Sequence, residues 1–286
     1  MKLLKFVLAA LCVATISAPA YAGTLYAATA AGSSGELYIL NSATGAMIQD
    51  IGPTTDAAGA NYPITGLAFH PTSGVLYGST GNSDANAAAR LVIINPLTAQ
   101  VTVVGPYNAG PVNGSGTPTT MADIGFDSAG NLYGVASIGG PNLYSINTAT
   151  GQATLVGANG VSTSTTGGGI AISPGGTFYG TPTASRYGTY NSGTGAFTNI
   201  TNPTKPTGGG AYGALDFDGN VLYGLNVGSG SPPPTALVTI DPATGNVTLV
   251  GNSLNSLDAI AFRVPEPAAV FLGAIGLAAF AAMRRR

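Results

Sequence analysis

Short runs in which apolar and polar residues alternate cover the chain between residues 23 and 264. Examples are "QVTVVG" (Gln100 to Gly105) and "NVTLVG" (Asn246 to Gly251). Such alternation is typical of half-buried β-strands, whereas a helix would show a period of about 3.6 residues. No part of this region has a helical period, so the pattern predicts an all-β body.

Four such segments recur in a constant order along this body. In one copy, "DIGF" leads through a Gly-Asn turn to "NLYGVAS", and "NLYSI" leads through "NTATG" to "ATLVG" (Asp123 to Gly157). A glycine at the end of the second turn suits a backbone with positive φ. The tyrosine of the second segment marks the period at Tyr26, Tyr77, Tyr133, Tyr179 and Tyr223, in steps of 51, 56, 46 and 44 residues. Each unit is predicted to form a four-stranded sheet.

One of the five units is divided between the two ends of the body. Residues 23–52 contain only the second, third and fourth segments, and "DAIAFRV" (Asp258 to Val264) contains only the first. Pairing these parts would close a ring of sheets and leave no open edge between the ends. The units resemble β-propeller repeats that carry a D-P-x-T-G turn, as in "DPATG" (Asp241 to Gly245). The predicted fold is a five-bladed β-propeller with four-stranded blades and a split closing blade; a β-sandwich and an open solenoid are the alternatives.

The N-terminus has the features of a secretory signal peptide. Lys2 and Lys5 precede an apolar run, and Ala20-Tyr21-Ala22 precedes Gly23. This arrangement predicts cleavage between Ala22 and Gly23, with export of the remainder. The predicted domains are therefore a signal peptide (1–22), a propeller (23–264) and a C-terminal segment (265–286).

That C-terminal segment has three parts in a fixed order. They are Val264-Pro265-Glu266-Pro267, the uncharged run 268–283, and Arg284, Arg285 and Arg286. The run of 16 residues is short for a transmembrane helix but can span with local thinning, and the arginines mark its cytoplasmic side.

Together these parts resemble the PEP-CTERM sorting signal. The resemblance implies a Gram-negative exporter, processing by an exosortase and delivery to the cell surface or an exopolysaccharide matrix. Pro265, Glu266 and Pro267 would be the recognition element, and the two prolines would hold the chain extended.

Composition narrows the chemistry of the body. Between residues 23 and 264 there are four basic and ten acidic residues, a formal charge of −6, which argues against a nucleic-acid partner. The single cysteine, Cys12, lies in the signal peptide, and His70 is the single histidine. A His/Cys zinc site is therefore excluded. We expect His70 to lie in a surface turn, and no cofactor or metal site is predicted.

Carboxylates are the remaining candidates for a site. "DFDGN" (Asp216 to Asn220) starts like a calcium loop but lacks its later ligands, so a hairpin turn is the better interpretation. Asp123 and Asp258 begin the first strand of two blades, and Thr65 and Tyr212 lie near the same level of two others. These four residues form a candidate ligand site at the mouth of the channel, although ordinary capping of strand ends is the simpler explanation. The repeated tyrosines are interpreted as packing between blades.

No catalytic constellation is visible in this sequence. The predicted function is therefore that of a non-enzymatic surface or matrix protein whose partners, besides exosortase and the Sec export machinery, are extracellular polysaccharide or surface proteins. Before processing, residues 268–283 would anchor the protein in the inner membrane with its body in the periplasm. The alternative is a propeller lyase or hydrolase that acts on an extracellular polysaccharide.

Overall fold

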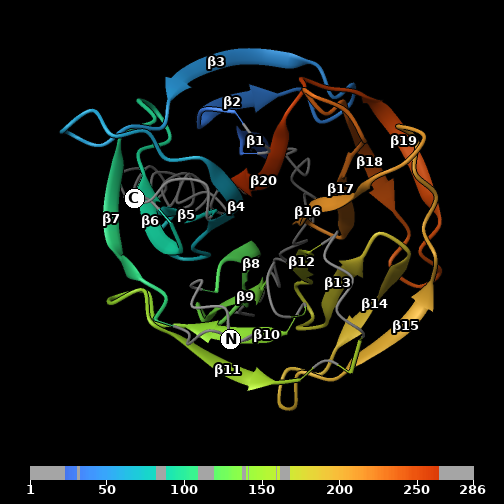
Figure 1. Cartoon of the computed structure of the whole chain (residues 1–286). Helices are drawn as coiled ribbons and strands as arrows, with labels where there is room; N and C mark the ends of the chain where they lie inside the picture. The colour runs from blue at the N-terminus through green and yellow to red at the C-terminus, as the bar shows by residue number, and fades with distance from the viewer. Residues whose placement is uncertain are drawn as a thin grey trace, which may run out of the picture.

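The protein forms a five-bladed β-propeller in the computed structural model (Figure 1). The structure describes residues 23–30, 33–81, 88–108, 119–136, 140, 142–158, 160–161 and 168–263. Within these residues every regular element is a β-strand, and the strands form five antiparallel sheets of four strands each. The predicted all-β architecture, the blade number and the four-stranded blades are confirmed.

The blades are numbered here in the order in which the chain enters them. Blade 1 consists of β20 (Leu257–Arg263), β1 (Thr24–Thr29), β2 (Glu36–Leu40) and β3 (Met47–Pro53). Blade 2 consists of β4 (Ile64–Phe69), β5 (Leu76–Thr80), β6 (Arg90–Ile94) and β7 (Val101–Pro106). Blade 3 consists of β8 (Met121–Phe126), β9 (Leu132–Ala136), β10 (Leu143–Ile146) and β11 (Ala153–Gly157). Blade 4 consists of β12 (Gly169–Ile172), β13 (Phe178–Thr183), β14 (Arg186–Tyr190) and β15 (Phe197–Thr201). Blade 5 consists of β16 (Ala211–Asp218), β17 (Val221–Val227), β18 (Thr235–Ile240) and β19 (Val247–Asn252).

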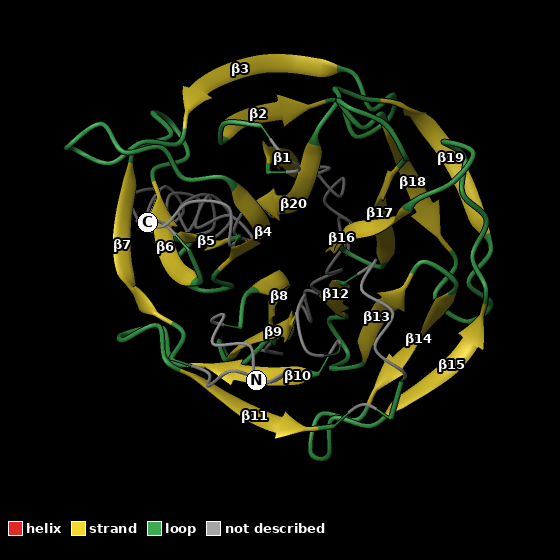
Figure 2. Ribbon diagram, in the orientation of Figure 1, coloured by secondary structure: helices red, strands yellow, loops and turns green. Residues whose placement is uncertain are grey.

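Blade 1 is the split unit that the sequence predicts. Its innermost strand, β20, comes from the end of the body and pairs antiparallel with β1, with Thr24 opposite Arg263 and Ala28 opposite Ala259. The first strand of each blade lies nearest the axis and the fourth lies at the rim (Figure 2). Neighbouring inner strands contact each other all the way around the ring. The chain therefore closes with a sheet that contains both ends of the body.

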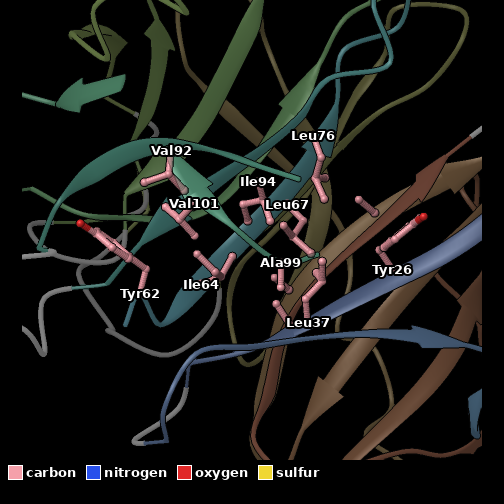
Figure 3. Packing of buried hydrophobic residues seen from close by; sticks show 13 residues of the cluster. Tyr26, Leu37, Tyr62, Ile64, Leu67, Leu76, Val92, Ile94, Ala99 and Val101 are labelled. Atoms are coloured by element: carbon pink, nitrogen blue, oxygen red, sulfur yellow. The ribbon is translucent and has the colours of Figure 1, made fainter. Parts of the chain in front are cut away.

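Large apolar side chains fill the spaces between neighbouring blades. Figure 3 shows one such cluster, in which Tyr26 and Leu37 of blade 1 lie beside Leu67 and Ile94 of blade 2. These side chains are almost fully buried. Burial of a side chain of this size contributes about 1.5–3 kcal/mol. Contacts between blades are thus a main source of stability for the ring.

The repeated tyrosines pack between blades, as predicted. Each tyrosine, on the second strand of its blade, lies against a phenylalanine of the next blade around the ring. The pairs are Tyr26–Phe69, Tyr77–Phe126, Tyr133–Phe178, Tyr179–Phe217 and Tyr223–Phe262, with ring centroids 4.8 to 5.8 Å apart. Aromatic pairs at such distances add to the stabilisation that comes from burial alone.

Two predicted segments lie outside the residues that the structure describes. These are the signal peptide, residues 1–22, and the C-terminal segment from Val264 to Arg286. The part of the chain that the structure describes contains no helix long and apolar enough to cross a membrane.

Candidate functional site

Four of the five inner strands contain an irregularity near their first residues. The pairing with the second strand skips one residue, so that Ile64 and Gly66 of β4 face consecutive positions of β5 while Thr65 has no partner in the ladder. Ala122, Gly213 and Asp258 are skipped in the same way. A residue left out of a ladder in this way is a β-bulge, which redirects its side chain.

The bulged residues meet at one end of the axis. Thr65, Ala122, Gly213 and Asp258, together with Gly168 just before β12, line a cavity of about 350 Å³. Its remaining lining comes from blade 5 and consists of Gly210, Ala211, Val227, Gly228 and Ser229. Inner strands begin at this end, so it is also the end that carries the connections between consecutive blades. The cavity is hereafter called the mouth cavity.

Among the described residues, Asp258 is the single carboxylate that lines the mouth cavity. Removal from bulk water raises the pKa of Asp258 from 3.8 to about 7, because burial penalises the charged form. Within the described part of the chain its carboxylate has no hydrogen-bond partner. A methyl group at Gly213 would lie 2.6 Å from Asp258 Oδ1, so the glycine keeps one side of the carboxylate open.

Thr65 lies on β4, the inner strand next to β20, and is held in place by its neighbours. Its Oγ1 donates to the carbonyl oxygen of Met121 at 2.7 Å and lies 2.9 Å from Ser79 Oγ. The bond to Met121 joins blade 2 to blade 3. Thr65 therefore presents a hydroxyl of fixed orientation, whose remaining lone pair can accept a hydrogen bond from a ligand.

Asp123 lies one position further along the inner strand than Asp258 and is enclosed. Its Oδ2 accepts N–H groups of Ile170 at 2.9 Å and Leu215 at 3.1 Å, and its Oδ1 accepts the N–H of Ile124 at 2.9 Å. It is 0% exposed. Burial raises its pKa, and the three N–H donors oppose that rise. The structure thus places Asp123 beneath the mouth cavity, where it joins blades 3, 4 and 5.

Tyr212 lies one position earlier than the bulge and packs in the apolar cluster between blades 4 and 5. Its side chain is fully buried, and its hydroxyl donates to the carbonyl oxygen of Thr204. Of the four residues of the predicted site, the structure brings Thr65 and Asp258 together at the mouth cavity. Asp123 and Tyr212 do not line the mouth cavity.

The other residues considered from the sequence are structural. His70 lies in the turn between β4 and β5, where its ring packs on Phe126 of blade 3 at 5.0 Å between centroids. The "DFDGN" segment forms a hairpin in which Asp218 pairs with Val221. Within the described residues, no three or more His, Cys, Asp or Glu side chains lie close enough to hold a metal ion.

Asp216 on β16 is a carboxylate that sequence reasoning did not place in a site. Its Oδ2 accepts the N–H of Phe262 in blade 1 at 2.6 Å, and its Oδ1 accepts the N–H of Phe217 at 2.8 Å. Burial raises its pKa to about 7. Asp216 and Asp123 therefore both bind backbone groups of other blades. They lie on inner strands that β12 separates and two aligned positions apart, so the repeat pattern did not mark Asp216.

A second hollow, of about 490 Å³, lies at the opposite end of blade 3. Its lining includes the turn residues Asn131, Asn147 and Thr148 and the side chains of Tyr133 and Gln152. It offers amides and hydroxyls but no carboxylate. We therefore place the candidate site at the mouth cavity, where polar groups of several blades converge.

These features define the class of protein: a five-bladed β-propeller of repeats whose C-terminus carries a sorting motif. Residues 263–286 match the PEP-CTERM protein-sorting motif, which confirms the resemblance seen in the sequence. Residues 26–231 match the model of a repeat family described as a repeat of unknown function (DUF6923), and the chain belongs to this family. No curated protein matches the chain.

Two solved structures are similar to the chain at low sequence identity. One is a structural genomics protein of unknown function from Bacteroides thetaiotaomicron VPI-5482, with 13% identity and a TM-score of 0.47. The match covers 76% of this chain and 55% of that one, so this chain spans about half the length of that protein. The other is the computationally designed Ika4 protein, with 15% identity, a TM-score of 0.35 and coverage of 66% of this chain and 98% of that one.

The PEP-CTERM motif implies an exported protein that is anchored and processed at the membrane, with exosortase as its processing partner. All the sorting residues from Val264 to Arg286 lie outside the described residues, as do Ala20 and Ala22 of the predicted cleavage site. Gly23, which follows that site, is described and buried.

Proposed function

We propose that this protein is a non-enzymatic binding protein of the cell surface or exopolysaccharide matrix, and that it holds a neutral polar ligand in the mouth cavity. The observation that carries the proposal is the lining of this cavity. It combines one weakly acidic carboxylate, the hydroxyls of Thr65 and Ser229, and glycines that leave backbone groups accessible. Such a lining suits the hydroxyls of a saccharide unit, which donate and accept hydrogen bonds without carrying charge.

The volume of the cavity supports a ligand of this size. About 350 Å³ lies at the lower end of the range of small-molecule sites. It is enough for one or two sugar rings and not for a folded partner. A polysaccharide would thus be held through one end or through a side branch, while the rest of the polymer contacts the surrounding loops.

The sorting motif supports the proposed location. After export, residues 268–283 would hold the protein in the inner membrane with the propeller in the periplasm. Exosortase would then recognise Pro265-Glu266-Pro267, and processing would release the propeller to the surface or matrix of a Gram-negative cell. A protein of a biofilm matrix meets polysaccharide at high local concentration, which makes a weak single site useful.

Binding is tested with the native matrix polysaccharide and with short oligosaccharides prepared from it, by calorimetric titration of the exported protein. We expect Asp258→Asn and Thr65→Val each to weaken binding by about 5-fold to 100-fold, the range for loss of one or two hydrogen bonds. Asp50→Asn is the matched control, because Asp50 is an exposed carboxylate of the outer strand β3. Equal affinity in all four proteins would reject the mouth cavity as the site.

The alternative, a lyase or hydrolase, is favoured by one observation. A carboxylic acid whose pKa is raised to about 7 can serve as a general acid at neutral pH, and Asp258 has this property. An assay for new reducing ends or unsaturated products separates the two functions. If the protein forms product and Asp258→Asn abolishes this turnover while ligand binding persists, the protein is an enzyme. If the ligand binds and no product forms, the result supports the binding protein.

The location is tested by intact-mass analysis of the protein in membrane, surface and medium fractions, with and without the host's exosortase. We expect loss of the residues that follow the Pro-Glu-Pro triplet, and release from the membrane, only when the enzyme is present. Retention of the complete tail in both strains would show that residues 268–283 are a permanent anchor.

A further inference from the structure

The backbone nitrogen of Gly23 lies against a carboxylate of another blade. It is 3.1 Å from Asp218 Oδ1 and 3.2 Å from Asp218 Oδ2. Gly23 is buried and directly precedes β1 of blade 1, whereas Asp218 ends β16 of blade 5. The contact therefore joins the first residue of the predicted exported body to the neighbouring blade, beside the strand that closes the ring.

Asp218 differs in its contacts from the aspartate at the equivalent turn of blade 3. Asp127 accepts hydrogen bonds within its own turn, from the N–H groups of Ala129 at 3.0 Å and Asn131 at 2.8 Å. The hairpin that follows β16 pairs Asp218 directly with Val221, and its carboxylate instead faces Gly23. The turn of blade 5 thus leaves both oxygens of Asp218 directed at one nitrogen atom.

A peptide nitrogen cannot use this arrangement fully. It carries one hydrogen, which must be shared between the two oxygens when both lie at nearly equal distance. An ammonium group carries three hydrogens and a positive charge, so it can donate separately to each oxygen. Charge-assisted hydrogen bonds of this kind are shorter and stronger than neutral ones. The geometry matches an ammonium group better than an amide.

We propose that Asp218 is the receptor for the α-ammonium group formed at Gly23 when the leader is removed, and that this salt bridge locks the closing blade to blade 5. The proposal rests on the predicted cleavage after Ala22 and is independent of ligand binding at the mouth cavity. In the hydrolysis, the bond between the Ala22 carbonyl carbon and the Gly23 nitrogen breaks. Water supplies hydroxide to the carbonyl and a proton to the nitrogen, and the amine takes a further proton from solvent.

The space around Gly23 favours a glycine at the new terminus. A methyl group there would lie 3.1 Å from Asp218 Oδ1, 3.2 Å from the carbonyl oxygen of Arg263 and 3.2 Å from Cδ1 of Phe262. These contacts are close, and two of them belong to the end of β20. A larger residue would displace the nitrogen from the carboxylate, and cleavage at another bond would leave the charge elsewhere.

The test compares exported proteins whose mature termini differ by one residue. One is the native chain; the other has an alanine inserted between Ala22 and Gly23, so that cleavage after Ala22 leaves Gly23 as an amide. Each is also made with Asp218→Asn and, as a matched control, with Asp127→Asn. All are purified after export in the full-chain context, and N-terminal sequencing and intact mass establish each terminus before thermal unfolding.

We expect the insertion to lower Tm by about 2–4 °C, the shift that corresponds to loss of one such interaction in a domain of this size. In the Asp218→Asn background the insertion should change Tm by less than about 1 °C, because the partner is already absent. In the Asp127→Asn background the full effect should remain. A purely steric effect of the extra residue would instead be the same in all three backgrounds, and that result overturns the proposal.

Two further outcomes are decisive. A native mature terminus other than Gly23 overturns the proposal directly. If Asp218→Asn does not fold, selective acetylation of the α-amino group replaces the variant: acetylation should lower Tm in the native chain and leave the inserted chain unchanged. Equal effects on both chains would show that the charge at Gly23 has no specific partner.

Discussion

Asp123 and Asp258 occupy inner strands of the same ring, only one aligned position apart, and experience different surroundings. Asp258 sits on a bulge and faces the mouth cavity, where its pKa rises to about 7. Asp123 follows a bulge and faces three backbone N–H groups in the closed part of the axis. One residue of register therefore separates a candidate ligand group from a structural one.

For Asp123 we predict a graded loss of stability. Asp123→Ala leaves the N–H groups of Ile170 and Leu215 buried without an acceptor, which should cost roughly 2–4 kcal/mol. Asp123→Asn keeps one acceptor oxygen and should cost less. Denaturant unfolding measures both, with the exposed Asp50→Ala as the control at under about 0.5 kcal/mol. Equal stability of Asp123→Ala and the control would refute the structural role.

For Asp258 we predict an unusual dependence of stability on pH. The pKa of its carboxyl is raised in the folded protein from 3.8 to about 7, so between these values the folded state binds more protons than the unfolded state. Stability therefore falls as pH rises through this window and levels off above it. The stability of Asp258→Asn should match that of wild type near pH 4 and exceed it by about 1–2 kcal/mol at pH 8. This is less than the full shift implies, because the side chain of Asp258 is partly exposed to solvent.

Asp216 and Asp123 have their pKa values raised in the same direction and contribute slopes of their own. The Asp258→Asn protein should consequently keep part of the decline between pH 4 and pH 7. Urea unfolding of both proteins at a series of pH values separates the contribution of Asp258 from that of the other two carboxylates. A wild-type stability that rises over this interval would contradict the prediction.

At the scale of the element, the turn between the third and fourth strands of each blade has two tasks. It reverses the chain, and it approaches the end of the fourth strand of the preceding blade. In blade 3 this turn ends at Gly151, with φ of 78°, and a methyl group there would lie 2.5 Å from the carbonyl oxygen of Gly105. Blade 2 has Ala99 at this position, with φ of 58°, and its side chain is fully buried between blades 1 and 2.

We predict that Gly151→Ala destabilises the protein more than its backbone angle alone explains. The left-handed conformation costs roughly 1 kcal/mol for alanine, and the collision with blade 2 should raise the total to roughly 2–4 kcal/mol. Gly176→Ala is the matched control, because Gly176 has φ of 83° and nothing within 4 Å of an added methyl group. Thermal or denaturant unfolding compares the two. Equal losses would mean that the blades yield to the extra methyl.

At the scale of the whole molecule, closure depends on one strand from the end of the body. β20 supplies the inner strand of blade 1, and Leu257, Ile260 and Phe262 are at most 3% exposed. Each such side chain contributes about 1.5–3 kcal/mol on burial, which together is comparable with the net stability of a domain. The Tyr223–Phe262 pair and the Asp216 bond to the N–H of Phe262 add to this closure.

We predict that an exported chain ended after Asn255 loses cooperative unfolding, because blade 1 lacks its inner strand and two blades lose their neighbour. A chain ended after Val264 lacks the C-terminal segment but keeps β20, and should melt within a few degrees of the complete protein. Circular dichroism during heating distinguishes a sharp transition from a gradual one. A sharp transition in the shorter chain would show that four blades fold without closure.

The sequence by itself determined the architecture, because the features that define a blade are local. Alternating strands, turn residues and one tyrosine per unit repeat at short range, and the division of one unit between the two ends predicts the closed ring that β20 and β1 form. The same regularity identified the tyrosines as packing residues, since a residue that every blade contains faces an equivalent neighbour in every blade.

Only the tertiary structure decided what the polar residues do. Bulges turn Thr65 and Asp258 into the mouth cavity, and a shift of one residue removes Asp123 and Tyr212 from it. Asp123 and Leu215 are 92 positions apart, and Gly23 and Asp218 are 195 apart. Contacts at such separations depend on how blades meet around the axis, and local periodicity contains no information about a one-residue offset between distant strands.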